Sequence, residues 1–266
     1  MTLQGQPVPV VSSLTGRTTA SLSAEVRPQV GGIVQKRLFT EGDMVKAGQA
    51  LYQIDPSSYR ATFNEAAASL KQAQALVIAD CQKAQRYAVL VKDNGVSRQD
   101  ADDAIATCNQ DKASVESKKA ALESARINLN WTTVTAPIAG RIGISSVTPG
   151  ALVSADQDTA LATIRGLDTM YVDLTRSSVD LLRLRKQSLA SNSDTLNVTL
   201  TLEDGSTYSE KGRLALTEVA VDESTGSVTL RAVFPNPQHV LLPGMFVRAR
   251  IDEGIMNDAI LAPQQG

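Results

Sequence analysis

Two stretches of this chain repeat one pattern of turns and strands, although they lie far apart. Residues 28–55 and 134–166 each run from a proline through a glycine turn into an alternating strand, then through a second glycine turn, a valine and an apolar strand. The matched positions are Pro28 with Pro137, Gly31 with Gly140, Ile33 with Ile142, Gly42 with Gly150, Val45 with Val153, Leu51 with Leu161 and Ile54 with Ile164. Each half alone would leave an apolar strand face uncovered, so we expect the halves to pack together as one β-sandwich. Two unrelated hairpins with common turn residues are the alternative.

The paired halves resemble a biotinyl or lipoyl carrier domain, a small sandwich that presents a modified lysine at the tight turn between its halves. Here the first half ends at Asp55, Pro56 follows, and the second half begins only after Trp131. The nearest lysine, Lys46, lies inside the first half and not at the junction. The sequence therefore predicts a scaffold without the cofactor position, and we expect no cofactor.

The segment between the halves predicts a helical hairpin. Asp55 as N-cap with Pro56 in the first helical position is a favourable helix start. Apolar or small residues then recur in steps of three and four, in two stripes that extend to Val91 and Asn130. The first stripe is Tyr59, Phe63, Ala66, Leu70, Ala73, Val77, Cys81, Ala84, Ala88 and Val91, and the second is Ala101, Ile105, Cys108, Val115, Leu122, Ala125 and Leu129. Two such helices would form an antiparallel coiled-coil hairpin about 50 Å long. An ordinary packed helical domain is the alternative.

A turn separates the two stripes. Asp-Asn-Gly at residues 93–95 is a turn signal, and Ser97 with Asp100 three residues later predicts a capping box at the start of the second helix. If the turn centres between Asn94 and Gly95, the two cysteines of the chain, Cys81 and Cys108, lie opposite each other. Two readings stay open: a disulfide, which would indicate an oxidising compartment, and a pair of reduced thiols in the helix seam.

The C-terminal part, from Met170 to about Ala262, has the pattern of a β-rich domain. Several short strands alternate with turns, and one amphipathic helix is expected over residues 177–187. The N-terminal sequence VPVVSSLTGRTT is β-prone, and we expect it to join these strands in a small antiparallel barrel. His239 lies between prolines, which predicts a plain loop histidine rather than a metal ligand.

Composition argues against several classes of function. The formal net charge of −2 gives no reason to expect a nucleic-acid partner. A single histidine, His239, argues against a histidine-based metal site and against a Ser-His-Asp triad. Ser, Asp and Glu are scattered without a catalytic arrangement, so we expect no enzymatic activity. No apolar stretch is long enough for a spanning helix, and the first residues do not read as a signal peptide.

In order along the chain, EVRPQVGGIVQKRLFTEGDMVKAGQALYQIDP, ARINLNWTTVTAPIAGRIG, LDTMYVDLTRSS and LLPGMFVRA resemble the periplasmic adaptors, or membrane fusion proteins, of tripartite RND multidrug efflux pumps, with the AcrA/MexA branch nearest. The resemblance covers essentially the whole chain. It implies a non-enzymatic adaptor that links an inner-membrane RND drug/proton antiporter to a TolC-type outer-membrane channel and assembles as a hexamer. It also implies a periplasmic protein attached to the inner membrane through an N-terminal lipid. An adaptor of an ABC-type exporter or a type I secretion system, and less so a biotinyl or lipoyl carrier component, are the alternatives.

The expected fold is therefore an elongated α+β multidomain chain. A β-barrel comprises residues 9–21 and 167–262, a lipoyl-like β-sandwich comprises 22–55 and 132–166, and the helical hairpin comprises 56–131. Because the family's lipid-bearing cysteine and its C-terminal segment are not in this sequence, we expect a truncated form that largely lacks the membrane-proximal domain.

The resemblance also implies where the channel is engaged. The family's hairpin tip carries an arginine, a leucine four residues later and a serine seven residues after that, which correspond here to Arg86, Leu90 and Ser97. The helical period agrees, because it directs Arg86 and Leu90 away from the seam. A solvated tip in which Ser97 is only a helix cap is the alternative.

Overall fold

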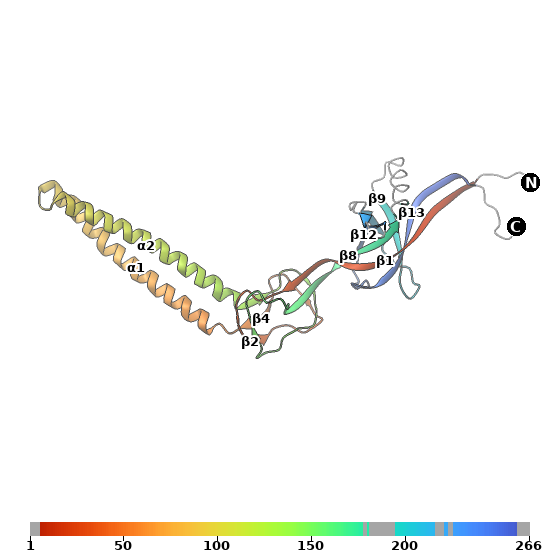
Figure 1. Ribbon diagram of the computed structural model, residues 1–266, viewed down its shortest axis with the longest axis horizontal. Helices are drawn as coiled ribbons and strands as arrows, with labels where there is room; N and C mark the ends of the chain where they lie inside the picture. Colours follow the sequence, from red (N-terminus) through yellow and green to blue (C-terminus); the bar gives the residue numbers. More distant parts are fainter. Residues whose placement is uncertain (1–5, 178–179, 181–194, 216–220, 223–225, 260–266) are drawn as a thin grey trace, which may run out of the picture. The chain divides into compact units, whose positions relative to one another are not determined.

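The computed structural model describes residues 6–177, 180, 195–215, 221–222 and 226–259 (Figure 1). The chain divides into two compact units. The barrel unit comprises residues 1–24, 138–142 and 164–266, and the sandwich unit comprises 25–137 and 143–163. Each unit is thus assembled from segments that are distant in the sequence.

The sandwich unit contains a four-stranded antiparallel sheet with the strand order β5-β4-β2-β7. The strands are β2 (Gly32–Arg37), β4 (Ala50–Ile54), β5 (Thr133–Thr135) and β7 (Leu152–Val153), and the short β3 (Met44–Val45) lies between β2 and β4 in the chain. β4 pairs with β5 and β2 with β7, so each pairing joins one sequence half to the other. The fully buried side chains include Val34, Leu51, Tyr52, Ile54 and Leu161, drawn from both halves. The predicted packing of two half-motifs is confirmed.

The barrel unit is a closed antiparallel sheet. Its strands are β1 (Gln6–Val26), β8 (Ala162–Ser177), β9 (Thr195–Thr201), β10 (Gly212–Ala215), β11 (Val221–Asp222), β12 (Ser227–Pro235) and β13 (Phe246–Ala259). They follow the order β11-β12-β10-β9-β13-β1-β8, and β12 pairs with β8 to close the ring. β1 lies between β13 and β8, which confirms that the N-terminal segment joins the barrel. The short β6 (Gly140–Ile142) also pairs with β8. The helix expected over residues 177–187 lies outside the described residues, apart from Ser177 and Asp180.

The barrel interior is filled mainly by aliphatic side chains, together with Phe234 and Tyr208. Met170, Val172, Leu174, Leu200, Leu214 and Phe234 are fully buried there. A side chain at Gly212 would place its Cβ 2.3 Å from the Phe234 ring, so only glycine fits beneath this ring. His239 lies in the loop between β12 and β13, where its Nε2 is 3.1 Å from Asp168 Oδ1.

The sandwich unit also contains the helical hairpin, formed by α1 (Ser57–Leu90) and α2 (Arg98–Trp131) (Figure 1). α1 begins one residue later than predicted, because Pro56 and not Asp55 occupies the N-cap position. Asp55 Oδ1 instead accepts hydrogen bonds from the backbone N–H (3.0 Å) and Oγ (2.6 Å) of Ser57. This local turn satisfies the first helical donor from outside the helix. No helix among the described residues is both long and apolar enough to cross a bilayer.

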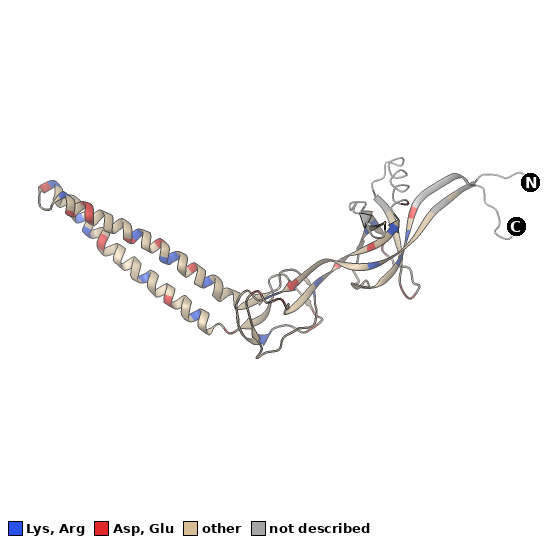
Figure 2. Ribbon diagram, viewed as in Figure 1, with Lys and Arg blue, Asp and Glu red and all other residues tan. Residues whose placement is uncertain are grey.

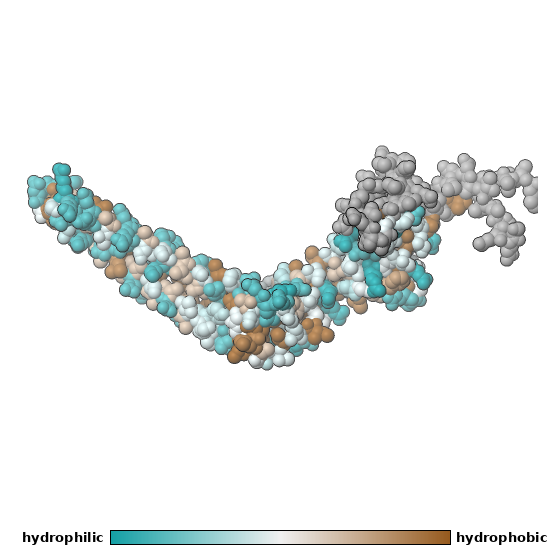
Figure 3. Space-filling view, in the orientation of Figure 1, coloured by the Kyte–Doolittle hydropathy of each residue, from teal (hydrophilic) through white to brown (hydrophobic). Residues whose placement is uncertain are grey.

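Small residues form the seam between the helices. Its buried members are Ala73, Ala84, Ala101, Ala104, Cys108 and Ala125. Two predicted seam positions are wrong: Ala88 is exposed, and Ile105 is 43% exposed. Tyr87 and Ala104 lie against the seam instead. A helical stripe takes steps of three and four in either order, so the period alone does not choose between neighbouring positions such as 87 and 88 or 104 and 105. Figure 3 shows hydrophilic residues over most of the visible hairpin surface, with scattered hydrophobic ones.

Candidate docking site at the hairpin tip

The turn at the hairpin tip is fixed by backbone geometry. A short 3₁₀ turn (Val91–Asp93) follows α1, and Asn94 then adopts the left-handed conformation with φ of 55°. Asparagine tolerates this conformation better than most residues. The Gly95 N–H donates to the Leu90 carbonyl at 2.9 Å, which closes the end of α1. The predicted Asp-Asn-Gly turn is confirmed.

Ser97 caps the second helix. Its Oγ accepts a hydrogen bond from the Asp100 N–H at 3.0 Å and donates one to Asp100 Oδ2 at 2.6 Å. The predicted capping arrangement is therefore present in a modified form, in which the carboxylate receives the serine hydroxyl. This bonding accounts for Ser97 without a partner protein.

Arg86 and Leu90 lie on the outer face of α1, one helical turn apart. Leu90 is 41% exposed and Arg86 is exposed. Together with Gln82, Gln85 and Val89 they line a shallow, mostly apolar depression. Within the described part of the chain Arg86 forms no ion pair, so its guanidinium is available to another molecule.

Sequence reasoning missed Val89, which is 61% exposed and adjoins Leu90 in the same depression. The signal was present, because Val89 and Leu90 are consecutive apolar residues that both lie off the predicted seam. An exposed aliphatic pair beside an arginine has the composition of a protein docking patch.

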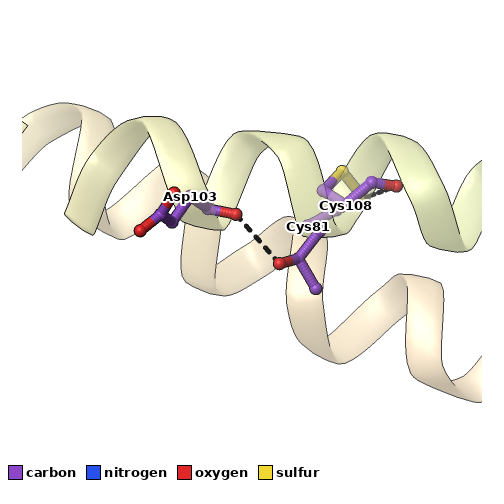
Figure 4. Close-up of a disulfide and its surroundings, with 4 residues drawn as sticks. Cys81, Asp103 and Cys108 are labelled. Carbon is purple, nitrogen blue, oxygen red and sulfur yellow. Dashed lines mark hydrogen bonds between the residues drawn. A yellow bond between two sulfur atoms is a disulfide. The ribbon is translucent and has the colours of Figure 1, made fainter. Parts of the chain in front are cut away.

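The two cysteines lie across the seam from each other. A disulfide joins Cys81 to Cys108, with the Cα atoms 4.8 Å apart (Figure 4). This separation is short for two packed helices and is compatible with the small residues that surround the pair. The disulfide closes a loop that contains Arg86, Leu90 and Ser97.

Charged residues of both signs are spread along both helices (Figure 2). Two carboxylates, Asp80 of α1 and Asp111 of α2, lie close together beside the disulfide. Burial, followed by the neighbouring Asp80 carboxyl, raises the pKa of Asp111 above its ordinary 3.8. Among the described residues no group of three or more histidine, cysteine, aspartate or glutamate side chains is arranged to hold a metal ion.

Comparison with known families agrees with this architecture. The family model for the barrel-sandwich hybrid domain of RND membrane fusion proteins matches residues 22–165, and the model for the β-barrel domain of the same proteins matches residues 169–255. The chain belongs to the RND membrane fusion proteins. As a member of this family, it is an adaptor that links an efflux pump to an outer-membrane channel.

Several curated relatives resemble the chain over almost its whole length. It is 55% identical to the multidrug export protein AcrE of Escherichia coli K12, over 98% of this chain and 69% of AcrE. It is 49% identical to the multidrug efflux pump subunit AcrA of the same strain, over 100% of this chain and 68% of AcrA. It is 53% identical to the multidrug resistance protein MexA of Pseudomonas aeruginosa, over 100% of this chain and 67% of MexA. The resemblance to the AcrA/MexA branch is thus confirmed.

Solved structures give the same fold. A MacA-MexA chimera that contains the α-hairpin domain of Pseudomonas aeruginosa MexA superposes with a TM-score of 0.70 at 27% identity, covering 98% of this chain and 87% of the chimera. MacA from Actinobacillus actinomycetemcomitans gives a TM-score of 0.71 at 23% identity, over 98% of this chain and 84% of MacA. The expected combination of barrel, split sandwich and inserted hairpin is confirmed.

Proposed function

We propose that this membrane fusion protein engages a TolC-type outer-membrane channel through the tip of its hairpin, while its other domains meet an inner-membrane RND drug/proton antiporter. Its role is to couple and seal a drug efflux conduit without chemistry of its own. The observation that carries the proposal is the outward apolar depression at Arg86, Val89 and Leu90, on a helix whose other face already packs in the seam. An aliphatic contact flanked by an unpaired arginine suits the side of another helical hairpin.

The proposal includes the partition of the chain into domains. The barrel comprises residues 9–21 and 167–262, the sandwich 22–55 and 132–166, and the hairpin 56–131. The two compact units and the two matched family ranges support the division between barrel and sandwich. The observed helix bounds support the limits of the hairpin.

We further propose that the protein acts in the periplasm as a hexamer, held at the inner membrane by an N-terminal lipid. The curated relatives support the periplasmic site, since two from Pseudomonas putida are described as periplasmic linker proteins. A disulfide in the hairpin is consistent with an oxidising compartment.

Drug resistance tests the docking assignment. Leu90→Glu places a charge in the depression, and Arg86→Glu reverses the charge beside it, so both should abolish resistance in cells that depend on this adaptor. Ile78→Glu is the matched control, because Ile78 is a 62% exposed aliphatic residue on α1 outside the depression.

All variants should reach equal protein levels, because no seam residue changes. Normal resistance with Leu90→Glu and Arg86→Glu would refute the assignment. Equal loss with Ile78→Glu would show that any new charge on the helix is harmful, and would also count against it.

A further inference from the structure

The disulfide encloses the whole proposed docking site. We call residues 81–108 the tip segment. This segment begins at Cys81, ends at Cys108 and contains Arg86, Leu90 and Ser97. Any opening of the helices within it would change the position of the docking residues relative to one another.

Apolar packing inside the tip segment is sparse. The buried cluster there consists of Ala84, Ala104 and Cys108, with Cys81 and Tyr87 partly buried against it. Stabilisation by burial scales with the apolar area removed from water, and alanine side chains contribute little area. The seam alone therefore holds this end of the hairpin weakly.

Like charges face each other beside the disulfide. Asp80 of α1, which immediately precedes Cys81, interacts with Asp111 of α2, which lies three residues after Cys108. Asp111 Oδ2 is buried, and no N–H or O–H group of the described residues donates to it. The charged and titratable groups on this side of the seam are Asp80, Lys83 and Tyr87 from α1 and Asp100, Asp103 and Asp111 from α2. Lys83 Nζ lies over the Tyr87 ring, 5.5 Å from its centroid. Carboxylates outnumber cations in this group, so ionised Asp80 and Asp111 repel each other across the seam.

We propose that the Cys81–Cys108 disulfide holds the tip segment closed against the repulsion between Asp80 and Asp111, and thereby positions Arg86 and Leu90 for docking. The cysteines are positioning residues, since they act on the docking site through the helices. The part that concerns docking rests on the proposed function, and the part that concerns closure does not.

The closure is reversible by thiol–disulfide exchange. A dithiol reagent supplies two electrons: its first thiolate attacks one sulfur of the Cys81–Cys108 bond, releases the other cysteine as a thiolate and forms a mixed disulfide. Its second thiolate then attacks the reagent's own sulfur in the mixed disulfide and releases the remaining cysteine thiolate. The products are two protein thiols and the oxidised, cyclic reagent. Protonation of Asp111, whose pKa is raised by burial and by the neighbouring Asp80, acts in the opposite direction, because it removes the repulsion between the two carboxylates.

Amide hydrogen exchange on the isolated full chain tests the closure. After correction for intrinsic exchange rates, amides of residues 82–107 should exchange at least about tenfold faster at about pH 7.5 when the disulfide is reduced. Amides of the hairpin stem, residues 60–75, should be unchanged. Cys81→Ala combined with Cys108→Ala should match the reduced protein, so the result does not depend on a reagent. Equal exchange in the oxidised and reduced proteins would overturn the proposal.

A rescue experiment tests whether the tip segment opens because Asp80 and Asp111 repel each other, or only because the crosslink is gone. In the cysteine-free background, Asp80→Asn with Asp111→Asn should restore slow exchange at neutral pH. Asp102→Asn removes one exposed carboxylate of α2 and serves as the control that should not. Lowering the pH from about 7.5 to about 4 should also slow exchange in the cysteine-free protein, but not in its Asp80→Asn/Asp111→Asn derivative. Equal rescue by Asp102→Asn, or no rescue by either change, would overturn the role of the carboxylate pair.

Docking is tested separately in cells, through crosslinking to the channel from a photoreactive residue at position 90. The cysteine-free protein should give a several-fold lower yield, and Asp80→Asn with Asp111→Asn should restore it. Hydrogen exchange is measured on the isolated chain, without the channel. If the closure proposal fails, the exchange rates do not change, whereas if the docking proposal fails, only the crosslink is missing. A loose tip segment with an undiminished crosslink would overturn the positioning role.

Discussion

Ser97 offers the sharpest separation between a structural and a docking role at the tip. Its Oγ accepts the Asp100 N–H at 3.0 Å and donates to Asp100 Oδ2 at 2.6 Å. Ser97→Ala removes both bonds, and the loss of an N-cap costs about 1 kcal/mol. This corresponds to roughly a fivefold increase in the local opening constant at the start of α2. We add nothing for the carboxylate bond, because both groups are exposed to solvent.

Ser97→Asn is the matched variant, because asparagine is as good an N-cap as serine and its side chain carries both an acceptor and a donor. Hydrogen exchange of the Asp100 and Ala101 amides should therefore be about fivefold faster in Ser97→Ala and close to the parent in Ser97→Asn. Equal exchange in the parent and Ser97→Ala would refute the capping argument, and so would equally fast exchange in both variants.

The same pair of variants decides whether the Ser97 hydroxyl also contacts the channel. If capping is its whole contribution, Ser97→Asn keeps full drug resistance and only Ser97→Ala loses part of it. If the hydroxyl also contacts the channel directly, resistance falls in both variants, although the start of α2 is intact in Ser97→Asn.

Three further predictions concern the scaffold. Gly212→Ala forces a Cβ against the Phe234 ring and should lower the stability of the barrel unit by about 1–3 kcal/mol or more, measured by thermal unfolding. Tyr52→Phe removes the hydroxyl bonded to Ser145 Oγ (2.7 Å) and to the Leu161 carbonyl (3.1 Å), and should cost about 1 kcal/mol in denaturant unfolding. Burial raises the pKa of Tyr52 above 10.0, so this tyrosine contributes stability that is lost as the pH rises through its raised pKa; Tyr52→Phe should abolish that alkaline component, and identical profiles would contradict the assignment. Protein purified without reductant should resist alkylation at both cysteines until a dithiol is added, and labelling without reduction would refute the bond.

The sequence was sufficient for the architecture because the decisive residues have few alternatives. Paired glycine turns and apolar strands recur in the same order in both halves, and a strand face that cannot be buried within one half predicts its partner. The hairpin followed from two unbroken helical stripes around Asn94 and Gly95. Cys81 and Cys108 are equally many residues from that turn, so the sequence also placed them opposite each other in the hairpin.

Local packing was harder to predict, for physical reasons. Asp55 accepts the Ser57 N–H from the position before the N-cap, which Pro56 occupies. The sequence therefore predicted the start of α1 at Pro56, one residue too early. Tyr87 and Ala88 both fit the helical step from Ala84, so the period alone did not decide which of them faces the seam. The Asp80–Asp111 pair could not be anticipated, because a carboxylate in a helix is normally solvated, and only the packing of α1 on α2 shows that one is partly buried.

The central claim is that the outer face of the hairpin tip contacts an outer-membrane channel. Photoreactive residues at positions 90 and 78, in the assembled pump in living cells, test it most directly. We expect crosslinks to the channel from position 90 and none from position 78. Crosslinks from position 78 alone, or from position 90 only to the inner-membrane transporter, would contradict the account.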